Sequence, residues 1–404
     1  MNAVTDIEPG ATLLSNAVLA GLEKDTAEVR GLPNEAFTTE SFLALEYRTL
    51  FRRSWVFAGR LSEIANPGDA EPVEVAGSAL FMARDSDGDV RVFHNVCPHR
   101  GARLVIESQR ETPVLTCPYH AWSFDLSGAL KGRPHFHGPG QHDRSNGAQA
   151  GGLDKVCLFE VRSATWHDLV FVNLDGKAQP FDEYIAPIDA HLDGWDLAQF
   201  EFAYHDRFEF HCNWKLAVEN FSDYYHNFKV HPGMVGAAYV AEESGPAHAA
   251  GVHLSLLSVM RDPEHMFSTS SVAGLPPLPD LAEKKRFHQP AAIVFPNSGM
   301  VLSCDFLVFV NFEPVTPQRS VMHLLFYFVG DAAQSAEYET ARRTAYREFE
   351  ILNKEDAGIC QRLQEGRSCD AYDGGRLAPF WDESTAHFHR QIANAVLARG
   401  AFLR

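Results

Sequence analysis

Two short loops in the first third of the chain each carry one cysteine and one histidine. Cys97 and His99 lie in "HNVCPHRGA", and Cys117 and His120 lie in "CPYHAW", with seventeen residues between the two pairs. A proline follows each cysteine, which indicates a turn at each pair. Two thiolates and two imidazoles bind either zinc in tetrahedral geometry or an iron–sulfur cluster. Unless the two pairs are unrelated, the chain must fold so that these loops meet at a metal.

The composition is that of an ordinary globular protein. The 404 residues, 45% of them hydrophobic and 22% charged, suffice for two or three domains. The formal net charge of −18 argues against nucleic-acid binding and weakly favours cationic substrates or basic redox partners. No run of about 18–20 apolar residues suggests a membrane span, and the N-terminus is acidic where a secretory leader is basic. We therefore expect a cytoplasmic protein, outside the membrane, whose seven scattered cysteines are reduced and otherwise pack in the interior.

The first half of the chain changes texture near residue 56. Residues 33–56 place apolar side chains at helical spacing after a Thr/Ser start, which predicts a helix. Residues 56–175 contain short β-rich runs broken by glycine, proline and aspartate, with a hairpin expected through "DSDGD". Within them, residues 132–153 predict a long polar loop, whose histidines favour a surface position over a further metal site. The region as a whole is expected to be a compact all-β domain.

The chain after residue 180 mixes strands and helices. Residues 291–331 predict three antiparallel strands with turns at "PNSG" and "PVTPQR". Residues 333–366 predict one long helix that Gly366 ends in the usual C-terminal role. The expected fold class is α+β, with an N-terminal all-β domain followed by an α+β domain whose antiparallel sheet is flanked by helices.

A second group of possible metal ligands lies in "NWKLAVENFSDYYHNFKVHPGM", residues 213–234. On a continuous helix, Glu219, Asp223 and His226 share one face through i+4 and i+3 spacing. Two histidines with one carboxylate form the facial triad of non-haem Fe(II) oxygenases, which leaves open positions for O2 and substrate. The alternative is a polar amphipathic helix whose histidines have ordinary hydrogen-bond partners.

The second histidine of this group, His231, meets the first only if the helix stops. His231 is five residues after His226, about 140° around a regular helix. Pro232 disfavours the α conformation of the residue before it. A helix that ends near residues 229–231 would let His231 fold back towards His226.

The flanks of the first two loops, "CPHRGA" and "CPYHAWSFDLSGAL", resemble the cluster-binding loops of Rieske domains. The resemblance implies that Cys97 and Cys117 bind one iron of a [2Fe–2S] cluster, and that His99 and His120 bind the other. Imidazoles in place of two thiolates raise the reduction potential of such a cluster. The resemblance leaves two roles open for Trp122, which either shields the cluster or only packs.

The loops depart from some Rieske proteins at three positions. Ala102 and Ser123 lie near the places where Rieske proteins of respiratory complexes have a disulfide, so the loops resemble the oxygenase or ferredoxin type. Ala121 lies where the family usually has glycine, which leaves the ligands unchanged.

Nearly the whole chain resembles the α subunits of Rieske non-haem iron oxygenases, the ring-hydroxylating oxygenase family. The resemblance implies that the "NWK…EN…D…H…H" segment supplies His226 and His231 as iron ligands. It also implies that Asp223 links the iron site by hydrogen bonds to a cluster histidine, matching His120, of a neighbouring subunit. Three regions follow from it: a helical segment at 1–52 that packs on the catalytic domain, a Rieske domain at 53–175 and the catalytic domain at 176–404.

The third iron ligand comes, by the same resemblance, from a distant C-terminal helix. The best match is Asp356 in "NKEDAGICQRLQEG". The adjacent Glu355 is a competitor, but it would point about 100° away on the helix. Asp370 and Asp382 are further candidates.

The resemblance implies a terminal oxygenase that uses O2 and a mononuclear Fe(II) to oxidise a small organic substrate. Because no Gly-x-Gly-x-x-Gly follows a strand, electrons from NAD(P)H should arrive through a separate ferredoxin or flavin reductase. A head-to-tail homotrimer would bring the two metal sites of neighbouring chains together. The alternatives are a Rieske electron carrier without oxygenase activity and a zinc-stabilised binding protein.

The substrate class stays open between aromatic rings and methylated amines or ethers, and so does the choice between mono- and dioxygenation. The stretch "LAPFWDESTAHFHRQIANAV" resembles the C-terminal end of relatives that act on quaternary ammonium compounds. Phe221, Tyr224 and Tyr225 near the expected iron site would suit either a cation or a stacked ring.

Overall fold

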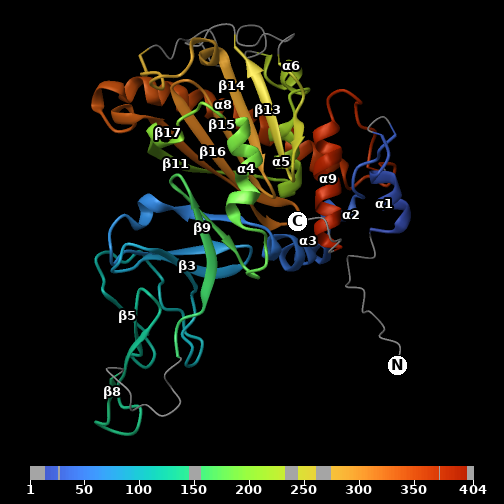
Figure 1. Ribbon diagram of the computed structural model, residues 1–404. Helices are drawn as coiled ribbons and strands as arrows, with labels where there is room; N and C mark the ends of the chain where they lie inside the picture. The colour runs from blue at the N-terminus through green and yellow to red at the C-terminus, as the bar shows by residue number, and fades with distance from the viewer. Residues whose placement is uncertain are drawn as a thin grey trace, which may run out of the picture. The chain divides into compact units, whose positions relative to one another are not determined.

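The computed structural model describes residues 14–25, 28–144, 156–232, 244–260, 274–372 and 374–397. The chain forms two units, one from Phe51–Ala178 and the other from Met1–Leu50 together with Gln179–Arg404 (Figure 1). The larger unit is therefore built from two stretches that are far apart in the sequence. In the described parts of the chain, no helix combines the length and the apolar character that a bilayer crossing requires.

Two antiparallel sheets build the smaller unit. One sheet has six strands in the order β1-β10-β9-β4-β3-β2, and the other has four in the order β5-β6-β7-β8, among the described residues. The prediction of an all-β domain is confirmed. The bounds are β1 Val56–Arg60, β2 Ala70–Val75, β3 Ser78–Arg84, β4 Val90–His94, β5 Val114–Thr116, β6 Ser123–Asp125, β7 Leu130–Arg133, β8 Asp143–Arg144, β9 Glu160–Trp166 and β10 Leu169–Asn173.

The predicted hairpin through "DSDGD" joins β3 and β4. The Asp85 side chain accepts the backbone N–H groups of Asp87 and Asp89, and it forms an ion pair with Arg91 at 2.7 Å. These bonds hold the turn in one conformation, with Gly88 at a φ of +89°. The hairpin is therefore set by local chemistry.

The core of the smaller unit carries the two cysteines of the first motif. Cys97 and Cys117 are buried in one apolar cluster with Phe81, Phe93 and Phe124. The loop predicted over 132–153 is only partly correct, because β7 and β8 pair across its start, and residues 145–153 lie outside the described ones. The two loops of the motif thus rest on a rigid β framework.

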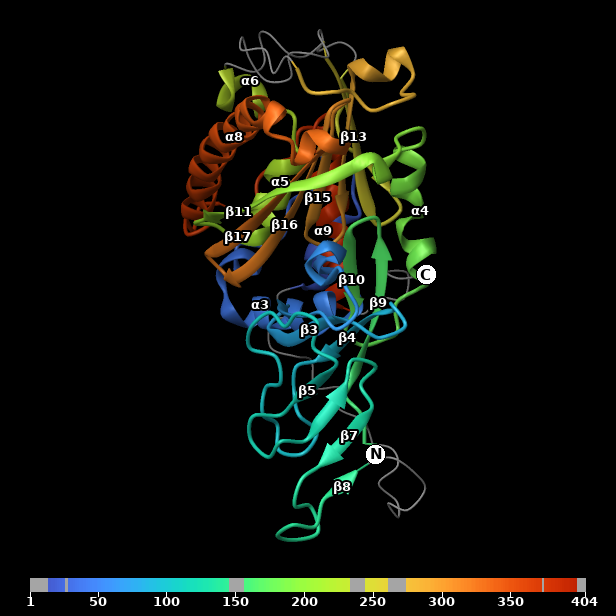
Figure 2. The same ribbon diagram turned by 90° about the vertical axis from the view of Figure 1, so that its left-hand side faces the viewer.

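A seven-stranded antiparallel sheet forms the centre of the larger unit, in the order β11-β17-β16-β15-β14-β13-β12 among the described residues. Figures 1 and 2 show α5 and α8 on one face of the sheet and α4 on the other. The bounds are β11 Phe200–Phe210, β12 His248–Ala250, β13 His253–Val259, β14 His288–Val294, β15 Ser298–Leu302, β16 Phe306–Thr316, β17 Arg319–Val329, α1 Asn16–Leu22, α2 Glu35–Thr38, α3 Glu40–Glu46, α4 Phe181–His191, α5 Trp214–Ser222, α6 Asn227–Val230, α8 Glu339–Gly366 and α9 Glu383–Val396.

Aromatic side chains join the sheet to the helices that cover it. Phe349 of α8 meets Phe306 and Phe326 of the sheet edge-on, and Phe221 of α5 meets Phe312 at 5.9 Å between ring centroids. Alternate residues of a strand face one side of a sheet, so these contacts place α5 and α8 on the same side. The second group of predicted ligands lies on this side of the sheet, on and beside α5 and α8.

Two predictions about the larger unit need correction. Residues 291–331 hold parts of four strands, because the turn at Ser303–Asp305 separates β15 from β16 and has no glycine or proline to mark it. The long helix begins at Glu339 instead of residue 333. It does end at Gly366, but the next residue, Arg367, has a right-handed φ of −66°, so no left-handed glycine cap is present there.

The predicted helix over residues 33–56 is interrupted and shorter. Thr39 is extended between α2 and α3 because its hydroxyl accepts the Phe42 N–H and begins a new helix, which runs on as a π-helical turn to Phe51. A fully buried ion pair at 2.7 Å joins Glu46 of α3 to Lys215 of α5 and so links this N-terminal segment to α5. Removing either partner would leave an uncompensated buried charge.

The helix predicted to run from Asp223 through His226 is wrong. Helix α5 stops at Ser222, and Asp223 is extended with φ −102° and ψ 120°. The Asp223 carboxylate accepts the N–H groups of Tyr225 and His226, which competes with continued helix. His226 and His231 then flank the short helix α6 at its two ends.

Of the seven cysteines, Cys157 and Cys369 are exposed, so they are not the packing residues that we expected.

Candidate metal centres

The two Cys/His loops of the smaller unit have the same backbone hydrogen bond. The Cys97 N–H donates to the Ala102 carbonyl at 2.7 Å, and the Cys117 N–H donates to the Trp122 carbonyl at 2.8 Å. Both loops are therefore closed five residues after their cysteine. The short span keeps the cysteine and the histidine of each loop close together.

Each loop also contains one left-handed residue at the equivalent place. Gly101 has a φ of +80° and Ala121 has a φ of +55°. A residue with a Cβ atom in this region costs about 1–2 kcal/mol. Glycine is thus the less strained residue for both loops, and Ala121 carries this cost in the second loop.

The four side chains of these loops fit a metal cluster. Cys97 and Cys117 are buried and unbonded to other cysteines, and the rings of His99 and His120 lie 4.6 Å apart. Among the described residues, the buried Nδ1 of His120 has no hydrogen-bond partner. A buried imidazole nitrogen without a donor or acceptor beside it suits coordination. Burial, then His120 and Arg100, lower the pKa of His99, which favours the neutral ring that binds metal.

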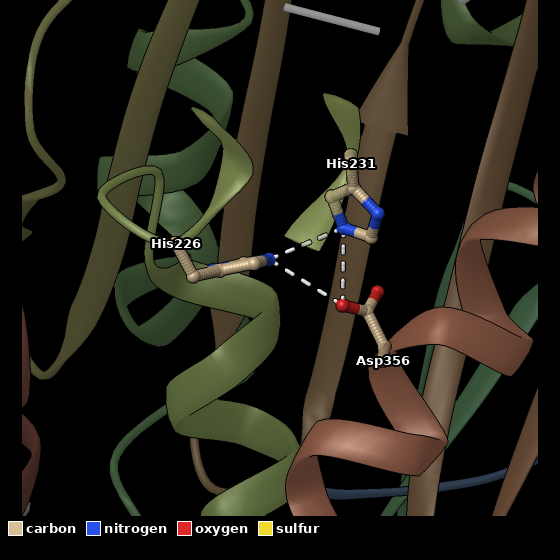
Figure 3. Close-up of side chains that lie close together, drawn as sticks. All are labelled: His226, His231 and Asp356. Carbon is tan, nitrogen blue, oxygen red and sulfur yellow. Dashed lines mark hydrogen bonds and ion pairs between the residues drawn. The ribbon is translucent and has the colours of Figure 1, made fainter. Parts of the chain in front are cut away.

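In the larger unit, His226, His231 and Asp356 converge on one point (Figure 3). The Nε2 atoms of the two histidines lie 3.2 Å apart. Oδ1 of Asp356 lies 3.4 Å from Nε2 of His226 and 3.1 Å from Nε2 of His231. Ligand atoms at right angles on bonds of about 2.1 Å are about 3 Å from one another. The triangle therefore has the size of one face of an octahedral metal site.

Charge and hydrogen bonding at this triangle also suit a cation. Burial opposes protonation of His226, but the nearby carboxylates of Asp223 and Asp356 outweigh it and raise its pKa to about 9. Although both imidazoles lie close to it, the buried Oδ1 of Asp356 has no hydrogen-bond partner of good geometry among the described residues. The carboxylates thus create a negative field where three ligand atoms point.

Two further carboxylates hold the outer nitrogens of the imidazoles. Nδ1 of His226 is 3.2 Å from Oδ2 of Asp223, and Nδ1 of His231 is 2.7 Å from Oε2 of Glu355. Such contacts fix the tautomer that leaves Nε2 free for a metal. The amide of Asn220 lies 3.3 Å from Nε2 of His226. Sequence reasoning missed Asn220, and it treated Glu355 only as a competing ligand that points away.

The other candidate carboxylates lie elsewhere. Glu219 forms a 2.8 Å ion pair with His389 of α9. Asp370 is exposed, and Asp382 accepts the Ala378 N–H in the loop before α9. In the surface loop, the Nδ1 of His135 accepts the Gly140 N–H, so its imidazole is not set up as a ligand.

The three predicted aromatic residues face different surroundings. Tyr224 packs on the sheet against the buried residues Leu256 and Ala291, on the side that α5 and α8 cover. Phe221 also faces the sheet. Tyr225 is 45% exposed and stacks on Trp381 at 5.6 Å. Only Phe221 and Tyr224 therefore belong to the layer between the sheet and the triad.

A cavity of about 370 Å³ lies on the other side of α5, away from the sheet. Its walls come from α5, α8, α9 and the loop before α9, and they include Asp223 and His226. The exposed Tyr225 contacts the exposed Phe228 and stacks on the half-buried Trp381. Tyr225 and Trp381 are next in sequence to the lining residues His226 and Asp382. The outer side of Asp223 is thus reached from the protein surface.

Comparison with known families identifies both units. Residues 197–398 match the family model "Ring hydroxylating alpha subunit (catalytic domain)", and residues 54–142 match "Rieske [2Fe-2S] domain". The chain belongs to the Rieske ring-hydroxylating oxygenase family. It is an oxygenase component with a [2Fe–2S] Rieske cluster and a mononuclear iron, and it uses O2 and externally supplied electrons. The match of the catalytic domain argues against the electron-carrier alternative.

Curated relatives cover most of the chain. The glycine betaine monooxygenase oxygenase subunit of Pseudomonas aeruginosa is 23% identical over 390 residues, 88% of this chain and 87% of the relative. The carnitine monooxygenase oxygenase subunit of Escherichia coli is 29% identical over 373 residues, 90% of this chain and 92% of the relative. The salicylate 5-hydroxylase large oxygenase component of a Ralstonia species is 32% identical over 205 residues, 50% of this chain and 48% of the relative.

Solved structures share the fold. A quaternary ammonium Rieske monooxygenase, described with insights into carnitine oxidation and inter-subunit electron transfer, has a TM-score of 0.71 at 20% identity and covers 91% of this chain and 95% of its own. Naphthalene 1,2-dioxygenase from a Rhodococcus species has a TM-score of 0.73 at 21% identity and covers 96% of this chain and 100% of its own. The α+β fold class predicted from the sequence is confirmed.

Proposed function

We propose that the oxygenase binds its cluster through Cys97, His99, Cys117 and His120 and its mononuclear iron through His226, His231 and Asp356. When bound, the two groups supply the one-electron transfer and the dioxygen chemistry of the reaction. The observation that carries the proposal is the triangle of three ligand atoms with sides of 3.1–3.4 Å. Asp223 and Glu355 hold the two imidazoles from behind.

The electron path runs between chains in this proposal. Asp223 forms a hydrogen bond with His226 on one side and, on the other side, with His120 of a neighbouring copy in a head-to-tail homotrimer. The surface opening beside Asp223 and the exposed aromatic residues around it support this role. A ring of three copies closes such a heterologous contact. Electrons enter from NAD(P)H through a separate ferredoxin or flavin reductase, and the reduced thiols of the chain fit a cytoplasmic location.

The first substrate candidate is a small methylated ammonium compound, which is oxidised at a methyl group so that formaldehyde leaves. The relatives named for glycine betaine and carnitine match about nine-tenths of the chain, while the salicylate relative matches half of it. The net charge of −18 also attracts cations. Ring hydroxylation of an aromatic acid is the second candidate, because the salicylate relative has the higher identity over its matched half.

The test combines a substrate panel with one metal-site variant. The purified chain is supplied with NADH and a flavin reductase, and glycine betaine, carnitine and salicylate are scored for O2 uptake, formaldehyde and hydroxylated product. Formaldehyde from the amines supports the first candidate, and hydroxylated salicylate alone supports the second. If a fully metallated protein oxidises none of these compounds, both substrate candidates are contradicted.

The variant His226→Ala should lose the mononuclear iron and all turnover while the visible spectrum of the cluster stays unchanged. His211→Ala is the matched control, since the His211 side chain lies just before α5 and is 64% exposed. Iron analysis reads out both variants. Retention of mononuclear iron and turnover by His226→Ala would refute the ligand assignment, and a protein that contains only zinc would refute the oxygenase.

A further inference from the structure

One of the two cluster histidines is covered by an indole ring. The rings of His99 and Trp122 are stacked, with centroids 4.5 Å apart and planes inclined by 2°. Trp122 is 7% exposed and covers one face of the His99 ring, while His99 itself is an exposed residue. The stack therefore fixes the plane of the imidazole and keeps water from that one face. Of the two roles that the sequence left open for Trp122, shielding is therefore the one that the contact supports.

A buried arginine lies on this indole. Arg133, the last residue of β7, is 1% exposed, and its guanidinium carbon is 5.3 Å from the Trp122 ring and 4.0 Å from the Phe136 ring. Arginine stays protonated at all ordinary pH values, and stacking on aromatic faces is a geometry that it favours. A permanent cation is therefore held one ring away from a ligand of the cluster.

We propose that Arg133, held on Trp122, raises the reduction potential of the cluster. Reduction adds one electron and breaks no bond, so the reduced form carries one more negative charge than the oxidised form. A nearby cation stabilises that form. Because Arg133 and Trp122 have low exposure, solvent and salt screen this attraction less. Net charge and solvent exposure are two of the levers that set the potential of iron–sulfur clusters. The inference rests on the proposed ligand set, and above all on His99.

The experiment compares three substitutions at one position in the full-length holoenzyme. Arg133→Lys keeps the charge, while Arg133→Gln and Arg133→Met remove it. The midpoint potential is measured by redox titration followed by circular dichroism and electron paramagnetic resonance of the cluster. We expect Arg133→Gln and Arg133→Met to shift the equilibrium about tenfold towards the oxidised form, which is about 59 mV for one electron. Arg133→Lys should stay within about threefold of the parent.

Arg91→Met is the matched control, because it removes a guanidinium from the same unit at the β3–β4 hairpin, where Arg91 pairs with Asp85. It should leave the potential unchanged. Equal potentials for the parent, Arg133→Lys and Arg133→Gln, with the cluster spectrum intact, would overturn the inference.

A loss of the cluster in Arg133→Met would leave the decision to the Lys and Gln variants, which are both polar and differ in charge. A parent protein without a Rieske spectrum would instead contradict the proposed ligand set. The two failures are thus distinguishable.

Discussion

Each imidazole of the proposed iron site lies between two carboxylates. His226 has Asp356 at its Nε2 and Asp223 at its Nδ1, and His231 has Asp356 at its Nε2 and Glu355 at its Nδ1. Carboxylates behind metal-binding histidines orient the ring and make it a better ligand. The adjacent residues Glu355 and Asp356 both contact His231, Glu355 at Nδ1 and Asp356 at Nε2. They therefore have different tasks, because neighbours on a helix point about 100° apart.

Substitution of Glu355 by alanine should weaken iron binding about 10–100-fold. The loss follows because Nδ1 of His231 no longer has the 2.7 Å contact that fixes its ring. Competition with a chelator measures the affinity of the mononuclear site. Glu350→Ala on the same helix is the control, since Glu350 forms an ion pair with the exposed Lys354 and its loss should not change iron affinity. Equal affinities for both variants would show that Glu355 has no such role.

Asp223→Asn should retain both metals and reduce kcat about 10–100-fold. The amide oxygen of asparagine still accepts the Tyr225 N–H that shapes the turn after α5. It lacks the negative charge that holds the proton on Nδ1 of His226 and that couples the two metal sites in the proposed trimer. Metal content and steady-state turnover measure the effect together. Normal turnover of this variant would contradict the bridging role.

At the scale of elements, the proposed iron site is built from helix ends and one helix middle. The end of α5 at Ser222 frees Asp223, the two histidines lie just outside the ends of α6, and α8 supplies the third carboxylate from its middle. The sheet behind them is stiff because each strand has antiparallel neighbours and α4 closes its far face (Figure 2). Short helices can therefore place ligands without a large core of their own.

The contact between α4 and the sheet is expected to make the larger unit acid-sensitive. His253 is fully buried, its Nδ1 accepts the Phe295 N–H, and its Nε2 lies 2.6 Å from the Tyr184 carbonyl, which requires the neutral ring. Burial lowers its pKa to about 4. Below pH 6.5 the unfolded chain binds the proton more readily, so this residue costs about 1.4 kcal/mol of stability per pH unit down to about pH 4.

Urea unfolding at pH 7 and pH 5 measures this effect. The parent should lose more stability over this interval than His253→Gln, whose side chain does not titrate. The difference between the two losses should be about 2 kcal/mol. An equal loss in both proteins would show that His253 does not titrate as expected.

At the scale of the molecule, the chain carries its electron-accepting and substrate-oxidising centres on two separate units. In the proposed trimer the cluster of one chain serves the iron of the next. A mixture of chains with complementary defects should then be active, although each chain alone is not.

Co-expression of Cys117→Ser with His226→Ala tests this arrangement. One chain lacks the cluster and the other lacks the iron, so only neighbours of the two kinds form a working pair. After random mixing in equal amounts, about a quarter of the parent turnover per chain should return over all trimers, and about a third in the mixed trimers alone, which have one working interface of three. Two affinity tags isolate the mixed oligomers, and the singly expressed variants are the controls. Mixed oligomers without turnover would contradict transfer between chains.

What the sequence by itself determined is local or characteristic of the family. Cys97 and His99, like Cys117 and His120, are close enough in the chain that a turn alone brings them together. The hairpin at Asp85–Asp89, the all-β unit and the α+β class also followed from patterns of neighbouring residues.

The tertiary structure alone decided which distant groups meet. His231 and Glu355 are 124 positions apart, and no periodicity relates them. The break at Asp223 depended on side-chain bonds to the backbone, which a helical pattern does not reveal. The stack of Arg133, Trp122 and His99 formed because the β7 strand returns beside the second loop. Such contacts arise when sheets and helices pack, so spacing along the chain cannot encode them one by one.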